Sequence, residues 1–393
     1  MKISLTELYA RRELLRNELA IKIGKESISK AINDYHAKRK PRPCGITVHS
    51  VIGCSSGCIY CYIPDMGFSN LHPMPYGLTK EELVLSLLSN KYFFPTVKGT
   101  YLAFGSVGEP FHPVGILKTI SYLEAVTSFL GNPIQVSTKM KIASDAYPRL
   151  GRLKTYPVNI LVTIVSLKYA EILEPSAPSP EQRFNVIRNL KDEGFKPILF
   201  FRPVIPGVNE EEAEEIFEKA RESGAVGVVI GGFRITRRIL SNLRRAGIDI
   251  SDIKNRIKTR PNGQTPVYTN DIKQKLVEIS REKNLIPFLS ACCANTYNIM
   301  ATTGLRIPCA NLCFINKKFC TNCPVNCKNI KIEVDEEEFK NSFYRMLNVK
   351  PDEVNVKQHS INVQVKKRKR RLLRRKAIIK TMESIYRKKI IVD

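Results

Sequence analysis

The chain has 393 residues, of which 43% are hydrophobic, and its formal net charge is +26 with a pI of about 9.7. This composition argues against a disordered chain, and the charge indicates a polyanionic partner. The ends carry most of the excess, with a net charge of +6 in residues 1–43 and +12 in residues 354–393. No apolar run approaches the roughly 18 residues of a membrane span, and no secretory signal is visible, so we expect a cytoplasmic protein that makes no membrane contact.

Helix-like and strand-like segments alternate along most of the chain. Residues 4–38 have a helical, basic pattern that the triplet Pro41-Arg42-Pro43 ends. The predicted strands are 46–52, 100–104, 134–137, 160–166, 197–201 and 226–230. The predicted helices among them are 78–88, 116–130, 180–193 and 210–223. Because apolar strands that alternate with helices pair in parallel, we predict an α/β fold: a partial (β/α)6 barrel of parallel strands.

Extensions flank this predicted core. We expect a basic helical N-terminal extension, the barrel core, a helical completion of the core, a Cys-rich region that binds metal or an Fe–S cluster, and a basic C-terminal tail. Their predicted ranges are 1–43, 44–235, 236–290, 291–330 and 331–393. Residues 285–330 show little periodicity, whereas the tail contains a predicted strand at 361–365 and a predicted helix at 378–386.

The first cysteine group follows the first predicted strand. Cys54, Cys58 and Cys61 have the spacing C-x3-C-x2-C within one short loop. Thiols stay reduced in the cytosol, so clustered cysteines favour a metal site over disulfides. Soft thiolates favour Fe–S clusters, zinc or Cu(I), and a [4Fe-4S] cluster normally takes four of them. Three thiolates would leave one iron free, while a zinc loop or plain buried thiols are the alternatives.

At these residues the sequence resembles the radical S-adenosylmethionine (SAM) superfamily. The three cysteines have an aromatic residue, Tyr60, before the last one, and Gly108-Glu109-Pro110 at the second strand end is similar to the family's GGE motif. The resemblance narrows to the spore photoproduct lyase-like branch. It covers about residues 44–235 and is carried by the segments 53–62, 137–139, 174–183 and 202–210.

The resemblance implies a cofactor pair and a set of contacts. Cys54, Cys58 and Cys61 would hold three irons of a [4Fe-4S] cluster, SAM would chelate the fourth, and a ferredoxin- or flavodoxin-like donor would supply the electron that cleaves SAM to a 5′-deoxyadenosyl radical. The residues expected to face SAM are Tyr60, Gly108, Glu109, Ser137, Lys139, Ser166 and Arg202. Glu109 would bind the amino group of the methionine and Lys139 its carboxylate, whereas a helix-terminal acid and a solvated lysine are the ordinary readings of these two residues.

Two features depart from the lyase. Its hydrogen-donor cysteine has no counterpart here, because no cysteine lies between Cys61 and Cys292, and the acidic motif reads GEP. The resemblance therefore supports SAM cleavage by this chain more strongly than it supports lesion repair. Glu174 and Arg183 are expected to pair and to fix the segment between them.

The second cysteine group lies in the predicted Cys-rich region. Its expected ligands are Cys309, Cys313, Cys320, Cys323 and Cys327. We favour a second [4Fe-4S] cluster, with zinc as the alternative and uncoordinated thiols as a third possibility. Cys292 and Cys293, just upstream, are interpreted as a core pair, with a hydrogen-donor role as the weaker alternative.

A dense basic block in the tail indicates nucleic-acid binding. It consists of Lys366, Lys367, Arg368, Lys369, Arg370, Arg371, Arg374, Arg375 and Lys376. Such a block neutralises phosphates and releases counterions. Arg11, Arg12 and Arg16 would form an opposite wall, and Phe343, Tyr344 and Tyr386 would stack on bases.

The sequence thus predicts a radical SAM enzyme that modifies or repairs a nucleic acid, with modification of tRNA or rRNA favoured slightly over DNA repair. A radical SAM enzyme that modifies a protein or peptide, and a non-catalytic Fe–S protein that binds nucleic acid, are the alternatives. The oligomeric state stays open.

Overall fold

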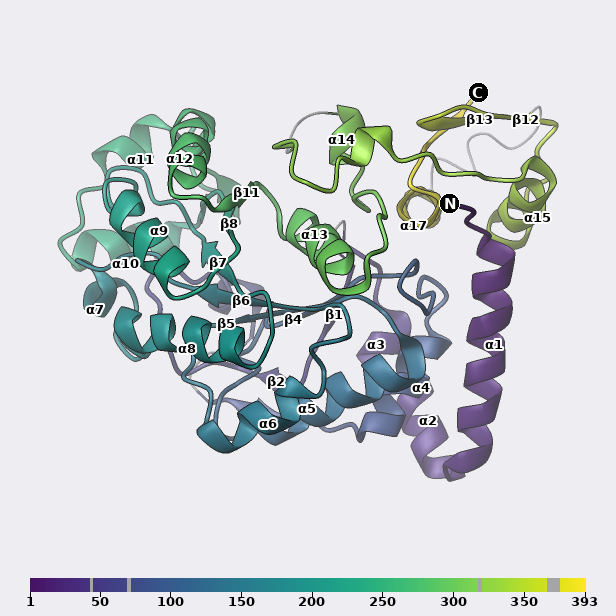
Figure 1. The fold of residues 1–393 in the computed structure, drawn as a ribbon, viewed down its shortest axis with the longest axis horizontal. Coiled ribbons are helices and arrows are strands. Elements are labelled where there is room, and N and C mark those ends of the chain that lie inside the picture. Colours follow the sequence, from purple (N-terminus) through teal and green to yellow (C-terminus); the bar gives the residue numbers. More distant parts are fainter. Residues whose placement is uncertain (43–44, 69–71, 317–319, 366–374) are drawn as a thin grey trace.

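The computed structural model describes residues 1–393 apart from 43–44, 69–71, 317–319 and 366–374. Its centre is a seven-stranded parallel sheet in the order β1-β4-β5-β6-β7-β8-β11 (Figure 1). The strands are β1 (Ile46–Val48), β4 (Leu102–Phe104), β5 (Ile134–Thr138), β6 (Val158–Thr163), β7 (Ile198–Phe201), β8 (Gly227–Ile230) and β11 (Ile286–Phe288). Since β1 and β11 are the two edges of this sheet, the barrel is open, and the predicted α/β fold is confirmed.

Six of the seven strands match predicted strands, with two differences. The predicted strand 46–52 ends at Val48, and β2 (Val51–Ile52) pairs antiparallel with β3 (Met74–Pro75) in a separate ribbon. The seventh strand, β11, lies in a region where no strand was predicted, because three residues are too few to show a period.

Helices cover one face of the sheet. In chain order they are α4 (Lys80–Ser89), α5 (Ile116–Ala125) with the π-helical turn Val126–Leu130, α6 (Tyr147–Gly151), α8 (Pro180–Asp192), α9 (Ala213–Glu222) and α12 (Asn270–Glu282). Alternate residues of each strand face them: Ile160 and Val162 of β6 belong to the large core on this side, whereas Leu161 belongs to the cluster on the other. Because both faces are covered, the strands are largely apolar.

One helix, α13 (Ala291–Thr303), covers the opposite face (Figure 1). It contacts β5, β6 and β11, and its Ala291 and Ala294 pack against Leu161 and Phe288. The cysteines at its beginning are therefore held against the sheet rather than in a separate domain.

Residues 234–283 are only partly helical. The helices are α10 (Arg237–Arg245), α11 (Ser251–Asn255) and α12, but β9 (Arg234–Ile235) and β10 (Thr265–Pro266) form a short antiparallel pair. The helical completion predicted for 236–290 contains these three helices, but β10 and β11 also fall within it, because such short strands have no readable period. The remaining short helices are α7 (Ala170–Leu173), α14 (Cys313–Asn316) and the 3-10 turns Pro64–Met66, Ser144–Ala146 and Cys327–Asn329.

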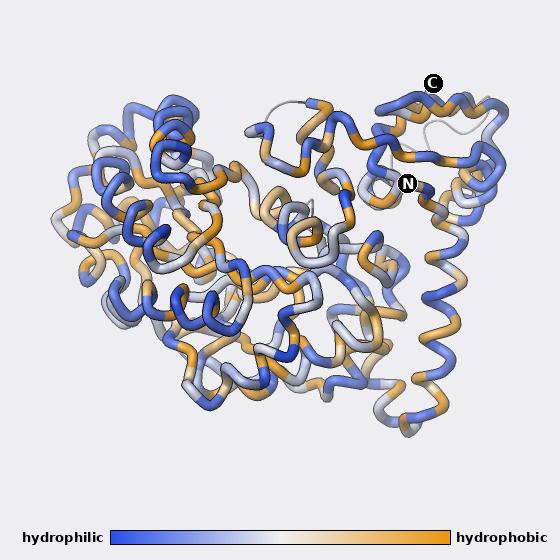
Figure 2. Tube along the Cα trace, in the orientation of Figure 1, coloured by the Kyte–Doolittle hydropathy of each residue, from blue (hydrophilic) through white to orange (hydrophobic). Residues whose placement is uncertain are grey.

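The C-terminal residues fold against the N-terminal helix. A sheet of β12 (Glu353–Val356), β13 (Ser360–Gln364) and β14 (Lys389–Val392) lies with α15 (Glu336–Leu347) and α17 (Lys376–Tyr386). The N-terminal helices are α1 (Leu5–Lys22), α2 (Lys25–Asn33) and α3 (Tyr35–Lys38). Apolar and polar residues alternate along α1 (Figure 2), which contacts α4 on one side and α15 and α17 on the other. The two ends of the chain therefore share one hydrophobic cluster.

This packing overturns some predicted nucleic-acid contacts. Phe343 and Tyr386 are fully buried in the cluster, so they cannot stack on bases, whereas Tyr344 is exposed. Arg12 is also buried and donates to the carbonyl oxygens of Asn90 and Phe93. None of the helices in the described part of the chain has the length and apolar character that crossing a bilayer requires.

Candidate functional site

The cysteine loop follows β2, a few residues after β1 ends, and is joined to the loop after β4. Gly53 and Gly108 form a parallel bridge, and the Glu109 amide donates to the Gly53 oxygen at 3.2 Å. A Cβ atom on Gly108 would lie 2.1 Å from the Val51 oxygen, so the two backbones can approach only at glycine. The predicted Gly108 thus has a steric role at this site.

A buried ion pair clamps the other side of the loop. The Tyr60 hydroxyl donates to Glu174, and Arg183 Nη1 lies 2.5 Å from Glu174 Oε2. Arg183 also donates to the Thr163 oxygen at 3.0 Å, at the end of β6. Glu174 and Arg183 are 2% and 1% exposed. The predicted pairing is confirmed, and it anchors the cysteine loop to a strand end as well as fixing its own segment.

The loop thiols are half-buried and lie beside charged groups. The Cys54 sulfur lies 3.3 Å from the Ser56 hydroxyl oxygen, and burial raises the pKa of Cys54. Burial raises the pKa of Cys58 to about 12, although the nearby Lys139 acts in the opposite direction. Since iron ligands must be thiolates, cluster binding at this loop would release protons.

Lys139 follows β5 and faces the loop. Its Nζ lies 3.9 Å from Glu174 Oε1 and 5.7 Å from the centre of the Tyr60 ring. Burial tends to lower the pKa of Lys139, but the neighbouring Cys58 and Glu174 outweigh burial and raise it above its usual value. A protonated ammonium therefore stands next to the Cys58 thiol.

Glu109 is buried and staples two strand ends together. Its Oε1 accepts from the Thr138 hydroxyl at 2.5 Å and from the Phe111 amide at 3.2 Å, and its Oε2 accepts from the Lys139 amide at 3.0 Å. Burial raises the pKa of Glu109, and these hydrogen bonds oppose the shift. A carboxylate accepts about four hydrogen bonds, so one direction is left for an ammonium group.

The other predicted cofactor contacts are placed less uniformly. Ser137 donates toward Phe104 and Gly105 oxygens at 3.4 Å, and the Ser166 hydroxyl donates to Glu212 at 2.6 Å. Arg202 is exposed, and its side chain lies over Gly231, where a Cβ would meet Arg202 Cδ at 2.4 Å. The Ser166 hydroxyl therefore already has a hydrogen-bond acceptor within the protein. The Arg202 side chain, by contrast, lies beside the ends of β7 and β8.

Three residues that hold the loop were not predicted from the sequence. Arg238 on α10 donates to the Cys61 oxygen and pairs with Asp65 at 2.8 Å. Asn242 donates to the Ile59 oxygen at 3.3 Å, and His112 Nε2 lies 3.1 Å from the Ser55 hydroxyl. Arg238 and Asn242 lie beyond residues 44–235, which the resemblance covers, and their spacing on a basic helix gives no separate signal.

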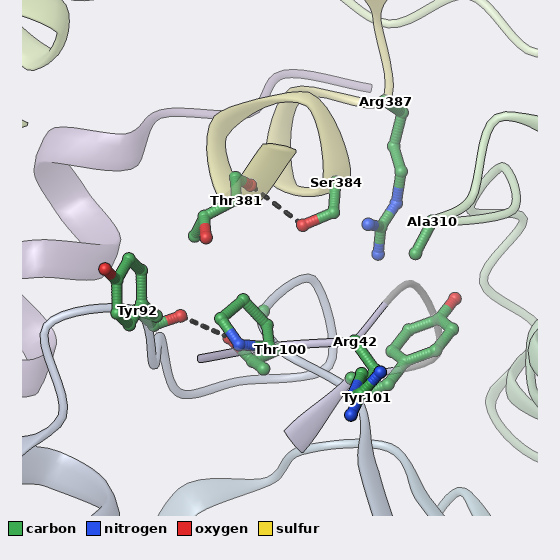
Figure 3. Close-up of a pocket in the computed structure, with 11 residues that line it drawn as sticks. Arg42, Tyr92, Thr100, Tyr101, Ala310, Thr381, Ser384 and Arg387 are labelled. Carbon is green, nitrogen blue, oxygen red and sulfur yellow. Dashed lines mark hydrogen bonds between the residues drawn. The ribbon is translucent and has the colours of Figure 1, made fainter. Parts of the chain in front are cut away.

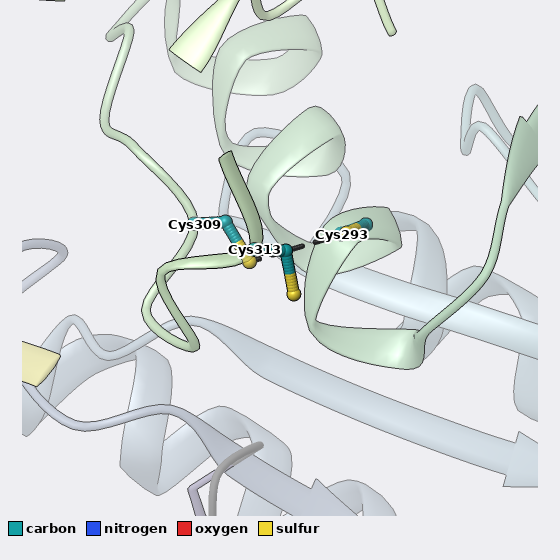
Figure 4. Close-up of side chains that lie close together, drawn as sticks. All are labelled: Cys293, Cys309 and Cys313. Carbon is teal, nitrogen blue, oxygen red and sulfur yellow. Dashed lines mark hydrogen bonds between the residues drawn. The ribbon is translucent and has the colours of Figure 1, made fainter. Parts of the chain in front are cut away.

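The second cysteine group gathers around Cys309. Cys309, Cys313 and Cys293 have sulfur atoms within 4.8 Å of one another, and Figure 4 shows them meeting from α13 and the segment that leads into α14. Cys309 also lies 3.9 Å from both Cys292 and Cys293. The structure therefore adds Cys293 to the predicted ligands, although the sequence pattern favoured a core pair.

The remaining thiols of this group lie near Cys309 but outside the tight set. Hydrogen bonds from neighbouring thiols hold the pKa of Cys309 well below its usual value. Burial, with a smaller contribution from Cys309, raises the pKa of Cys327 to about 12 and also raises that of Cys323. Thiolates on one zinc ion, at about 2.3 Å each, lie roughly 3.8 Å apart, which is close to the observed sulfur spacing.

Most of the basic block lies outside the described residues, which resume at Arg375 and Lys376. Arg375 donates to the Leu347 oxygen at 2.7 Å, and Lys376 is exposed. The prediction that Lys366, Lys367, Arg368, Lys369, Arg370, Arg371 and Arg374 bind phosphates falls on residues outside this description.

Comparison with known proteins identifies the central part of the chain. Residues 48–220 match the family model of the radical SAM superfamily. This part of the chain is a radical SAM domain. The prediction of an enzyme is confirmed at the level of this superfamily, with the reaction subclass open, and the family implies a [4Fe-4S] cluster and SAM as cofactors.

The chain is also similar to a viral protein and to two structures of one lyase. An uncharacterized protein, ORF301 of Acidianus two-tailed virus, is 22% identical over 58% of this chain and 75% of its own length. A cysteine-to-alanine mutant of spore photoproduct lyase superposes with a TM-score of 0.52 at 14% identity, covering 67% of this chain and 85% of that one. A double mutant of the same lyase with bound AdoMet and dinucleoside spore photoproduct gives a TM-score of 0.50 at 15% identity, covering 65% and 79%. At these identities the likeness concerns the fold of the radical SAM domain.

Proposed function

We propose that this radical SAM enzyme holds its cluster on Cys54, Cys58 and Cys61 and acts on a nucleic acid. One observation carries the cofactor part: three thiols from a single loop a few residues after the end of β1 lie beside Lys139, and Glu109 lies one strand end away. Bound there, a [4Fe-4S] cluster and SAM supply a 5′-deoxyadenosyl radical that abstracts hydrogen from the substrate.

The residues of this chain bind and orient. Glu109 offers a buried carboxylate to the amino group of SAM, and Lys139 offers an ammonium to its carboxylate. The clamp of Tyr60, Glu174 and Arg183 holds the loop in place, and Arg238 supports it from α10. Such support holds the residues that contact a cofactor in a narrow range of positions.

A nucleic-acid substrate is supported by charge and by likeness of fold. The net charge of +26 gives the chain a strong attraction for polyphosphates. A structural neighbour contains a dinucleoside lesion, so this fold can accommodate nucleotide-sized substrates. We favour modification of tRNA or rRNA over DNA repair, because no cysteine lies between Cys61 and Cys292 to serve as the hydrogen donor. The basic ends would supply the binding surface, and residues 44–235 would supply the chemistry.

We also propose a second metal centre at Cys293, Cys309 and Cys313, completed by Cys292 or by Cys320, Cys323 or Cys327. The tight sulfur spacing favours one tetrahedral ion, such as zinc, over the second [4Fe-4S] cluster, whose thiolates each bind a different iron and so stand further apart. About four irons and one zinc per chain would support zinc, and about eight irons would support the cluster.

The experiment that tests the function has two stages. Anaerobically reconstituted protein with dithionite and SAM should release 5′-deoxyadenosine, and its absence would reject the enzyme proposal. Nucleic acid that copurifies with the protein is then sequenced and its modifications compared with those of a strain that lacks the gene. A modified peptide in place of a modified nucleotide would support the protein-modifying alternative.

A further inference from the structure

An arginine outside the proposed catalytic site is buried without a hydrogen-bond partner among the residues that the structure describes. Arg387 follows α17 in a left-handed conformation, with φ of 55°, and is 1% exposed. Its Nε, Nη1 and Nη2 have no hydrogen-bond partner among the residues that the structure describes. A buried guanidinium that lacks a partner is costly, by several kcal/mol in typical proteins, so such a side chain calls for an anion.

The guanidinium of Arg387 lines a pocket between α17 and the segments that precede β1 and β4 (Figure 3). The pocket has a cavity volume of about 20 Å³, and about 290 Å³ when the open space at its mouth is included. Arg42, which is exposed, also lines it. Two arginines from distant parts of the sequence therefore meet at one hollow.

The lining contains positive charge and few other free donors. Neither Asp nor Glu is among the described residues that line the pocket. The hydroxyls of Ser384 and Thr381 already donate within α17, to the Thr381 and Ala377 oxygens, and the Tyr101 hydroxyl is paired with Thr296. The arginines are thus the groups left to bind a ligand, and a guanidinium fork matches two oxygens of a phosphate.

We propose that Arg387 and Arg42 form an oxyanion site that takes one phosphate group. A cavity of this volume has room for about one water-sized oxygen atom, so the rest of a bound phosphate would lie in the open space at the mouth. A contact with phosphate oxygens carries no sequence information. That this phosphate belongs to a nucleic-acid strand rests on the function proposed above; free inorganic phosphate is the other source of the same chemistry.

The strongest rival assigns Arg387 to the second thiol group. Its guanidinium carbon lies 5.2 Å from the centre of the Tyr101 ring, and Tyr101 packs in the same cluster as Cys292 and Cys309. In that case the arginine would balance the negative charge of a thiolate–metal centre, and phosphate would be irrelevant to it.

The test uses the full chain, anaerobically reconstituted, as wild type, Arg387→Met and Arg42→Met. Arg244→Met removes the same charge from an exposed position on α10, far from α17 (Figure 1), and is the matched control. Inorganic phosphate, compared with chloride at equal ionic strength, should raise the unfolding midpoint of the wild type by about 2 °C. Both pocket variants should bind phosphate about tenfold more weakly, whereas the control should behave as the wild type does.

A second arm identifies the source of the phosphate. Binding of a single-stranded RNA oligonucleotide is measured against salt concentration, and the slope should fall by about 1 in each pocket variant. An unchanged slope with weakened phosphate binding would support a site for free phosphate. Unchanged phosphate binding in both variants would overturn the proposal, as would an Arg387→Met protein that loses the second metal and keeps its phosphate response. If Arg387→Met does not fold, Arg42→Met decides, because Arg42 is exposed. Formation of 5′-deoxyadenosine by the wild type is scored separately, so failure here leaves the proposed function testable.

Discussion

The two cysteine regions both present thiols, but they differ in how deeply the thiols are buried and in how closely the sulfur atoms approach one another. A few residues after the end of β1, Cys54, Cys58 and Cys61 are half-buried beside a lysine and a buried carboxylate. In the second group, Cys309 and Cys313 are buried, and with Cys293 they form the tight set of sulfurs. Among the described residues no other set of three His, Cys, Asp or Glu side chains brings its ligand atoms within 4.8 Å of one another, so the loop thiols stand further apart.

This difference follows the general division between open and closed metal sites. A catalytic centre keeps one position for a ligand, whereas a structural centre is filled by protein. The loop has three thiols with charged groups that suit the two ends of an amino acid, and the second group has more thiols than one centre needs. On this comparison we propose that the first region binds a cofactor and that the second stabilises the fold.

The largest effect should come from removing one thiol of each region. Cys58→Ala should abolish formation of 5′-deoxyadenosine, because two loop thiolates do not retain a cluster, while the second metal stays bound. Cys313→Ala should lose the second metal and keep SAM cleavage within a few-fold of the wild type. The measurements are product analysis and metal content of both proteins. Loss of SAM cleavage in Cys313→Ala, with its loop cluster retained, would contradict the division proposed here.

A second prediction concerns stability. Cys309 lies at the centre of the second group, 3.9 Å from two other sulfurs, so Cys309→Ser should remove the metal and lower the free energy of unfolding by several kcal/mol. Chemical unfolding under anaerobic conditions measures this. Treatment of the wild type with a chelator should lower stability by a similar amount. A stable variant that has lost its metal would show that the second group is not structural.

The clamp beneath the loop should give a smaller effect. Glu174→Gln leaves Arg183 buried with a neutral partner, and breaking a buried pair typically costs about 3 kcal/mol or more. We expect a lower unfolding midpoint and reduced iron content at the loop, with the second metal retained. Glu181→Gln on α8 removes an exposed carboxylate from the same region and is the control. Equal losses of iron in the two variants would argue against a role for the clamp.

Sequence reasoning reached the sheet and the thiol loop because both rest on local patterns. Apolar runs separated by helices predicted six strands, and the spacing of Cys54, Cys58 and Cys61 predicted a cluster loop. The pairing of Glu174 with Arg183 was also accessible, since both lie in one short segment.

Long-range packing produced what sequence reasoning missed. Cys293 meets Cys309 only because α13 lies across the face of the sheet opposite α8, and Tyr386 is buried only because α17 packs against α1. Neither contact has a period or a spacing that a sequence can show. The support of Cys61 by Arg238, 177 residues away, belongs to the same class.

The smallest predicted effect is a loss of stability in acid that arises from His49, at the base of the cysteine loop. His49 follows β1, and its ring lies 5.3 Å from that of His36 and 5.8 Å from that of Tyr76. Burial, together with the positive charges of His36 and Arg39, lowers the pKa of His49 to about 3, whereas Asp34 acts in the opposite direction. The unfolded chain therefore takes up a proton near pH 6.5 that the folded chain refuses, so stability should fall as pH drops from about 6.5 toward 3.

His49→Phe keeps an aromatic ring in the same surroundings and removes the titrating group. Its free energy of unfolding should depend less on pH, by up to about 1.4 kcal/mol for each pH unit between 6.5 and 4.5. Both proteins carry the same second centre, so the difference between their urea unfolding curves isolates the base of the cysteine loop. Parallel pH profiles would mean that His49 is protonated in the folded chain, and that the loop is held by the clamp and the glycine contact without help from this aromatic group.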